Sequence, residues 1–189
     1  MSQEYGRGAG QPAVEAVVRV ATSDDDRAIA ALRRAWTEER EGGDPIPDDD
    51  FEPAFLEWAD RERSRRINWI AEVDGRPVGM LNMAVFTRMP RPVPEPGPAP
   101  TGRWGYIANN FVLAEYRSAG VGTRMLEAAV AYADEHDFAR IVLTPTERSV
   151  PYYARAGFVP ATALLVRPGR GDWIASEPHP RQAPTSMGS

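Results

Sequence analysis

The order of strand-like and helix-like segments predicts one α/β (α+β) domain, built as a single mixed sheet with helices on both faces. Three observations support this fold class. Short runs rich in valine and isoleucine alternate with amphipathic helical patterns. An Asp-Gly pair at positions 74–75 joins two of the runs, and a turn containing Gly120 and Gly122 leads from a strand into a helix. A chain of 189 residues with 42% hydrophobic content and no long apolar run suits one domain.

The first part of the domain is predicted to be a strand followed by two helices. The valine-rich segment 14–20 is typical of a strand, and the apolar spacing over 24–40 is typical of a helix. Ser23 and Asp26 have the three-residue spacing of a capping box at the start of that helix. A break rich in glycine and proline follows, and Pro53 then fits the first turn of a second helix.

The middle of the chain carries the hairpin. Segments 68–73 and 77–88 flank the Asp-Gly pair, which supplies the positive φ angles of a tight turn. Residues 89–102 have a proline at nearly every second position, which excludes a helix or a central strand. We interpret this segment as a long exposed hairpin loop, with a lid or a partner-binding arm as the alternative.

The last part of the domain alternates strands and helices again. A strand precedes the glycine turn and an amphipathic helix follows it, and a short helix with Gly157 as its C-cap comes near the end. The expected segments are a strand over 104–113, a helix over 122–136, a strand over 140–143, a helix from Ser149, and a final strand from 158–160 and 162–166. The domain then covers 14–167, between a flexible N-terminus (1–13) and a flexible C-terminal tail (168–189).

Composition excludes several classes of function. The net charge of −5 and the pI near 5.2 disfavour nucleic-acid binding, which needs a basic surface. The absence of cysteine excludes disulfides and thiolate chemistry, and only two histidines remain for a metal cluster or a His-based triad, so no metal is expected. No segment has the pattern of a membrane span or a secretory signal, so we expect no membrane partner and a cytoplasmic location.

The glycine turn has the properties of an anion site. A strand that leads into a glycine-rich helix start presents unpaired N–H groups and the positive end of the helix dipole at one place. A P-loop would need a lysine, but all 22 basic residues are arginine. The G-x-G-x-x-G turn of dinucleotide-binding domains is also absent. A different phosphate-binding turn is therefore required.

The run R-S-A-G-V-G, directly after F-V-L-A-E-Y, resembles the Q/R-x-x-G-x-G/A signature of the GNAT (GCN5-related) N-acetyltransferases. The resemblance implies a mostly antiparallel mixed sheet in the order β-α-α-β-β-β-α-β-α-β, and acetyl-CoA as co-substrate. The turn would bind the pyrophosphate and the preceding strand edge would pair with the pantetheine arm. The cofactor-binding residues that it implies are Phe111, Val112, Leu113, Arg117, Ser118, Ala119, Gly120, Val121, Gly122, Thr123, Arg124 and Ser149.

A second motif, Y-Y-A-R-A-G-F, is similar to the [FL]-Y-x-x-x-G-F ending of the same family. By that resemblance Tyr153 lies near the sulfur and protonates the departing thiolate, since a phenol with a pKa of about 10 is protonated at neutral pH. The alternative is an aromatic core residue, the role that we expect for Tyr152. Thr146 stands where many members have asparagine, and Ser149 is expected to replace that contact. Ala114 replaces the usual proline before the turn.

The sequence does not supply a general base. The strand before the turn offers Asn109 and Asn110, which cannot accept a proton at neutral pH. Carboxylates on the first helices and their loop are more simply solvated surface charges, so no base is assigned. The candidates for that role are Glu38, Glu39 and Asp50. Trp36, Tyr106 and Asn109 are candidates for the acceptor pocket, although core packing is the better expectation for Trp36.

The sequence therefore predicts an acetyl-CoA-dependent N-acetyltransferase that acts by direct transfer in a ternary complex. The acceptor would be a small-molecule or peptide amine, and its identity stays open. A non-catalytic acyl-CoA-binding sensor and a transferase for a longer acyl group are the alternatives. A homodimer is expected from the family resemblance alone.

Overall fold

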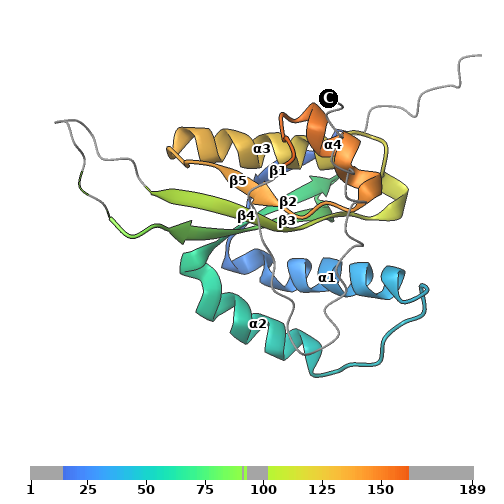
Figure 1. The fold of residues 1–189 in the computed structure, drawn as a ribbon. Helices are drawn as coiled ribbons and strands as arrows, with labels where there is room; N and C mark the ends of the chain where they lie inside the picture. Colours follow the sequence, from blue (N-terminus) through green and yellow to red (C-terminus); the bar gives the residue numbers. More distant parts are fainter. Residues whose placement is uncertain (1–14, 91, 93–101, 162–189) are drawn as a thin grey trace, which may run out of the picture. The chain divides into compact units, whose positions relative to one another are not determined.

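The computed structural model describes residues 15–90, 92 and 102–161. The chain divides into two compact units, Met1–Thr144 and Pro145–Ser189. The described part of the first unit contains a five-stranded sheet covered by helices (Figure 1). The described part of the second unit contains one short helix after a 3-10 turn.

The sheet has the strand order β1-β2-β3-β4-β5. The first three pairings are antiparallel, and β4 pairs with β5 in parallel. The mixed, mostly antiparallel sheet expected from the sequence is therefore confirmed. The strands are β1 (Val17–Val20), β2 (Arg66–Val73), β3 (Arg76–Thr87), β4 (Arg103–Val112) and β5 (Ile141–Leu143).

Helices cover both faces of this sheet, as the sequence predicts. Helices α1 (Asp26–Arg40) and α2 (Phe51–Glu62) lie on one face, and α3 (Val121–Glu135) lies on the other (Figure 1). Because β4 and β5 are parallel, the chain has to cross over between them, and α3 is that crossover.

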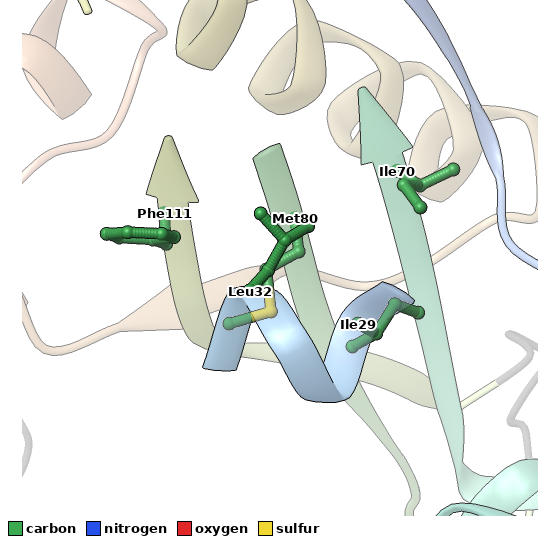
Figure 2. Close-up of a cluster of buried hydrophobic side chains, with 5 residues drawn as sticks. All are labelled: Ile29, Leu32, Ile70, Met80 and Phe111. Atoms are coloured by element: carbon green, nitrogen blue, oxygen red, sulfur yellow. The ribbon is translucent and has the colours of Figure 1, made fainter. Parts of the chain in front are cut away.

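The core on the α1 face is a cluster of five buried side chains (Figure 2). Ile29 and Leu32 are one turn apart on α1, so both side chains point at the sheet. They meet Ile70, Met80 and Phe111, which belong to the three adjacent strands β2, β3 and β4. Burial of this apolar surface attaches α1 to the centre of the sheet.

The β2–β3 hairpin has the turn that Asp74 and Gly75 predict. Their φ angles are 50° and 73°, and both lie in the left-handed region that a two-residue hairpin turn requires. β2 begins at Arg66, slightly before the predicted segment. The hairpin prediction is confirmed.

The capping box at the first helix is displaced by one residue from its predicted position. The cap is Thr22, whose hydroxyl accepts from the Asp24 N–H, and the reciprocal partner is Asp25 instead of Asp26. The reason is a 3-10 turn over Ser23–Asp25, which starts the helical path before α1. The prediction of Ser23 and Asp26 as the pair was therefore wrong.

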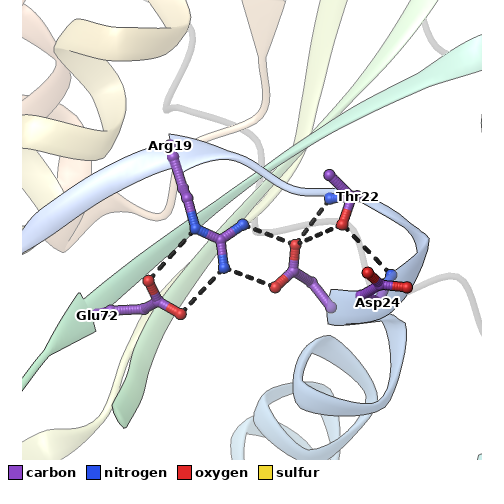
Figure 3. A network of polar contacts seen from close by, with 5 residues as sticks. Arg19, Thr22, Asp24 and Glu72 are labelled. Atoms are coloured by element: carbon purple, nitrogen blue, oxygen red, sulfur yellow. Dashed lines mark hydrogen bonds and ion pairs between the residues drawn. The ribbon is translucent and has the colours of Figure 1, made fainter. Parts of the chain in front are cut away.

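Asp25 also joins α1 to the sheet through Arg19 on β1. The Arg19 guanidinium donates to both oxygens of Asp25 at 2.7 and 2.8 Å and to both oxygens of Glu72 on β2 at 3.0 and 3.3 Å. Figure 3 shows Arg19 between Glu72 and the start of the helical turn. The hydrogen bonds from Arg19, together with the Thr22 N–H, lower the pKa of the buried Asp25 carboxyl to about 2.

The second unit confirms one prediction and contradicts another. Helix α4 (Val150–Arg155) is followed by Gly157, where φ is 86°, and the Phe158 N–H donates to the Tyr153 carbonyl at 3.1 Å, as expected for a glycine just after a helix. Residues 158–160 form no strand, although the sequence predicted one. The exposed Val159 and the fixed φ of Pro160 fit a loop better.

Other predictions fall outside the described residues. These are the strand over 162–166, most of the proline-rich segment, and the boundaries of the two flexible ends. The predicted first strand extends to residue 14, which lies outside them too; the structure begins β1 at Val17.

The Asp25 network predicts a pH-dependent loss of stability. Because the folded state lowers this pKa from 3.8 to about 2, the contribution is complete above about pH 4 and disappears as the pH falls towards 2. We expect Asp25→Asn to reduce the unfolding free energy by about 1–2 kcal/mol at pH 6, after allowance for solvent screening at the part-exposed Arg19. Urea unfolding from pH 6 to pH 2.5 should show the gap to wild type closing. The control is Asp24→Asn, an exposed neighbour, and a gap that stays constant with pH would contradict the assignment.

Candidate functional site

The glycine turn connects the end of β4 to the start of α3. A 3-10 turn over Ala114–Tyr116 follows β4, and Ser118 and Gly120 then take left-handed φ angles of 63° and 82°. Gly120 is the N-cap of α3, and no side chain caps the helix there. The N–H groups of the first helical turn therefore point towards the turn, where a helix N-terminus attracts an anion.

The space around Gly120 is open. A Cβ atom built at this position would meet nothing within 4 Å among the described residues. The glycine is therefore required by its backbone conformation, and a longer side chain would occupy the space in front of the helix start.

The edge of β4 extends beyond its pairing with β5. The parallel pairing covers Gly105 to Ile107, so the strand continues to Val112 without β5 as a neighbour. The Leu113 N–H donates to Val78 on the β3 side at 2.9 Å, and since successive residues alternate, the Val112 carbonyl faces away from β3. Among the described residues no strand pairs with this side of β4 beyond Ile107, so an extended ligand can join the edge there.

Arg117 is held by Glu39 on α1. Its terminal nitrogens donate to the two carboxylate oxygens at 2.8 and 2.5 Å, and its Nε donates to the Val112 carbonyl at 2.8 Å. The Arg117 hydrogen bonds lower the pKa of Glu39, and the same bonds raise the pKa of Arg117. The sequence suggested Arg117 as added positive charge for a phosphate, and the structure places its guanidinium on a carboxylate.

The three candidates for the acceptor pocket lie in different settings. Trp36 stacks on Phe111 with ring centroids 6.2 Å apart, so it packs against the core cluster. The Tyr106 hydroxyl is 3.3 Å from the Thr144 hydroxyl, beside β5. Asn109 on β4 lies directly opposite Asn82 on β3.

A row of asparagines crosses the sheet on the α1 face, and sequence reasoning missed it. Asn68 is opposite Asn82, and Asn82 is opposite Asn109, so all three share one face of β2, β3 and β4. Asn82 is buried, donates to Asn68 at 2.6 Å, and accepts from Arg66 at 2.8 Å. Asparagine is depleted in strands, so its presence in three predicted strands was the available signal.

A cavity of about 230 Å³ lies near one end of this row, at the start of β2. Asn68 and Arg66 reach it from the sheet, and Trp58 and Glu62 reach it from α2. Arg66 also pairs with Glu62 at 3.4 Å, and its guanidinium lies 4.8 Å from the centre of the Trp58 ring. Charges in this cavity are thus matched within the protein.

The second unit holds the candidate acid. Tyr153 on α4 contacts the rings of Tyr152 and Phe158 in edge-on geometry, with centroids 4.8 and 5.8 Å apart. The Ser149 hydroxyl donates to the Thr146 carbonyl at 2.9 Å and accepts from the Thr146 hydroxyl at 3.0 Å. Thr146, at the position of the family's asparagine, is therefore bonded to Ser149, the residue expected to replace its contact.

The three carboxylates considered as general bases do not have the surroundings that would identify one of them as the base. Glu38 accepts the Ile46 N–H at 3.1 Å, and Glu39 is paired with Arg117. Asp50 stands at the N-cap of α2 without a side-chain cap bond. His136, at the end of α3, is 2.9 Å from the Tyr132 carbonyl through Nδ1 and stacks on the Tyr132 ring, as suits a helix C-terminus.

Comparison with known protein families identifies the family to which this glycine turn belongs. The family model described as the acetyltransferase (GNAT) family matches residues 29–158, more than half of the chain, including both motifs. The chain belongs to the GNAT acetyltransferase family. It is therefore an acyltransferase, an enzyme of acyl-CoA-dependent acetyl transfer.

Solved structures of the same fold agree with the membership. A GCN5-related N-acetyltransferase from Ralstonia eutropha JMP134 is 25% identical, with a TM-score of 0.62 over 83% of this chain and 100% of that one. A predicted acetyltransferase with acetyl-CoA from Clostridium acetobutylicum is 22% identical, with a TM-score of 0.63 over 82% and 96%. An aminoglycoside acetyltransferase from an uncultured soil metagenomic sample, in complex with sisomicin, is 15% identical, with a TM-score of 0.61 over 82% and 95%. No curated protein matches this GNAT chain.

Metal-binding clusters and membrane-spanning helices are both absent from the described residues. Within residues 15–90, 92 and 102–161, no three His, Cys, Asp or Glu side chains gather as a metal site would require. In the same part of the chain, none of the helices has the length and apolar character to cross a bilayer.

Proposed function

We propose that the chain transfers the acetyl group of acetyl-CoA directly to an amine in a ternary complex, with Tyr153 as the general acid. The observation that carries the proposal is the R-S-A-G-V-G turn, with left-handed Gly120 at the uncapped start of α3. It follows the stretch of β4 that β5 leaves uncovered. One ligand with a diphosphate at one end and an amide-bearing arm at the other matches both features.

The cofactor would be held mainly by backbone groups. The N–H groups from Ala119 to Thr123 would bind the pyrophosphate, because they lie next to the positive end of the α3 dipole, whereas the Arg124 N–H already donates to the Gly120 carbonyl at 3.0 Å. The pantetheine amides would pair with the edge of β4 at Phe111, Val112 and Leu113 like an added strand, and the Val112 carbonyl, which accepts from Arg117 Nε, has a second lone pair for such a bond. Ser118 and Ser149 are the hydroxyl candidates for further contacts.

The chemical step needs a proton for the departing sulfur. The amine nitrogen attacks the thioester carbonyl carbon, the C–S bond breaks, and the Tyr153 hydroxyl gives its proton to the thiolate. The Tyr153 ring is held between Tyr152 and Phe158, and the Gly157 cap fixes the end of its helix. A general acid has to be held in position, and these contacts hold the Tyr153 ring.

The amine would lose its own proton to water. The part of β4 before the turn carries Asn109 and Asn110 and no carboxylate, and amides do not accept protons at neutral pH. This arrangement favours acceptors whose amines are already partly neutral at the working pH. Tyr106 and Asn109 remain our candidates for contacts with the acceptor.

The acceptor is proposed to be a small-molecule or peptide amine. The aminoglycoside acetyltransferase with sisomicin has the same fold, so we include aminoglycosides among the compounds to test. We expect a cytoplasmic enzyme without metal, nucleic acid or membrane partners, and a homodimer stays an expectation.

The direct test is an amine panel with acetyl-CoA, read as free CoA release and product mass. Aminoglycosides, polyamines, amino acids and peptides with free N-termini cover the main classes of amine. We expect acetylation of at least one class, and acetyl-, propionyl- and succinyl-CoA in parallel will show the acyl preference. Tight acetyl-CoA binding without turnover on any amine would favour a non-catalytic acyl-CoA sensor.

The position of the cofactor site is tested by Gly120→Asp. A carboxylate at the helix start would repel the diphosphate, and a side chain there would also fill the open space in front of the turn. We expect CoA affinity to fall at least about 10-fold by calorimetry. Gly43→Asp is the control, because Gly43 also has a positive φ of 92° and open space but lies outside the turn. Unchanged affinity in Gly120→Asp would place the cofactor elsewhere.

The acid is tested by Tyr153→Phe, which removes only the hydroxyl. Loss of a general acid reduces kcat by about 10²–10⁴-fold. We expect kcat to fall within that range while KM for acetyl-CoA changes little, measured with the best acceptor from the panel. Tyr152→Phe serves as the control on the adjacent ring and should retain activity. Equal effects of the two substitutions would indicate packing instead of proton transfer.

A further inference from the structure

We propose that Glu39 is a positioning residue for the cofactor turn. It holds Arg117, and through Arg117 it keeps the turn over 117–120 in the shape that binds the pyrophosphate. The inference rests on the cofactor site proposed above. Glu39 on α1 would help to bind the pyrophosphate without contacting it.

Three donor nitrogens of Arg117 bind two partners, one on a helix and one on a strand. The two terminal nitrogens bind the two oxygens of Glu39, and Nε binds the Val112 carbonyl at the end of β4. The planar guanidinium with a bidentate carboxylate has one preferred geometry, unlike a lysine ammonium. Arg117 is thereby fixed to a helix and to a strand simultaneously.

A row of stacked groups supports the same arrangement. The Arg117 guanidinium lies 5.5 Å from the centre of the Phe111 ring, which stacks on Trp36 of α1 at 6.2 Å. Arg33 lies 4.5 Å from the centre of the Trp36 ring on its own helix. Arg33, Trp36 and Glu39 follow one another at intervals of three residues, so they lie on successive turns of α1. Phe111 is buried, which gives the stack a fixed base.

The turn needs such support because its backbone is unfavourable. Ser118, directly after Arg117, has a φ of 63°, which is uncommon for a residue other than glycine. Gly120 has a second left-handed angle two residues later. If Arg117 were released, the turn would sample other conformations, and binding the cofactor would have to order it again.

The expected effect is therefore on cofactor affinity and not on the chemical step. Glu39→Gln keeps the size of the side chain but removes the charge and one acceptor oxygen of the bidentate pair. The opposite possibility is that Glu39 competes with phosphate for Arg117. In that case Glu39→Gln would free the guanidinium and strengthen CoA binding.

The experiment compares Glu39→Gln with Glu41→Gln, which makes the same change in net charge nearby on an exposed side chain. CoA binding is measured by calorimetry, which does not depend on an acceptor. We expect CoA affinity about 3- to 10-fold weaker for Glu39→Gln and within about 2-fold of wild type for Glu41→Gln. KM for acetyl-CoA should rise equally, while kcat and the melting temperature stay near wild type. Because both partners are partly exposed, the difference should shrink in high salt.

A double-mutant cycle with Arg117→Gln shows whether Glu39 affects CoA binding through Arg117. If Glu39 acts through Arg117, Glu39→Gln should have no further effect on CoA affinity in the Arg117→Gln protein. An undiminished effect there, tighter CoA binding, or affinity equal to wild type would each overturn the positioning role. These results differ from failure of the proposed function, in which the wild-type protein would bind no CoA or acetylate no amine.

Discussion

The short parallel pairing of β4 with β5 is the constraint on which the rest of the structure depends. Parallel strands need a crossover, and here the crossover is α3, whose N-cap Gly120 comes soon after the end of β4. The start of the helix is therefore placed beside the end of the strand. Since the pairing stops at Ile107, the next stretch of β4 has an edge that no other strand of the described part of the chain covers. An anion site and a strand edge are brought together by one topological requirement.

Local signals in the sequence were sufficient to predict most helices, strands and turns of the fold. The Asp-Gly hairpin, the glycine turn and the Gly157 cap each depend on residues that permit a positive φ, and all three are found. The capping box was misplaced because Thr22 and Ser23 both satisfy the pattern, and only the 3-10 turn decides between them. The strand predicted over 158–160 had apolar residues but no neighbour that the sequence could specify.

The candidate site was less predictable because its contacts are long-range. Arg117 and Glu39 are 78 positions apart, and no spacing rule links them. Arg117 was correctly assigned to the turn, but its bond to a carboxylate follows from where α1 packs on the sheet. The asparagine row likewise depends on the register of three strands, which sequence patterns specify only loosely.

Arginine–carboxylate pairs fix α1 at both of its ends. At the N-terminus Asp25 is bound to Arg19 of β1, and next to it Asp26 is bound to Arg63 beyond α2 at 2.7 Å. At the C-terminus Glu39 is bound to Arg117 of the turn. Between these ends the buried cluster attaches the helix to three strands. Exposed pairs contribute little to stability singly, so their value lies in geometry. α1 cannot shift along the sheet without breaking pairs at both ends. The asparagine row and the turn at the end of β4 therefore keep a fixed position relative to each other.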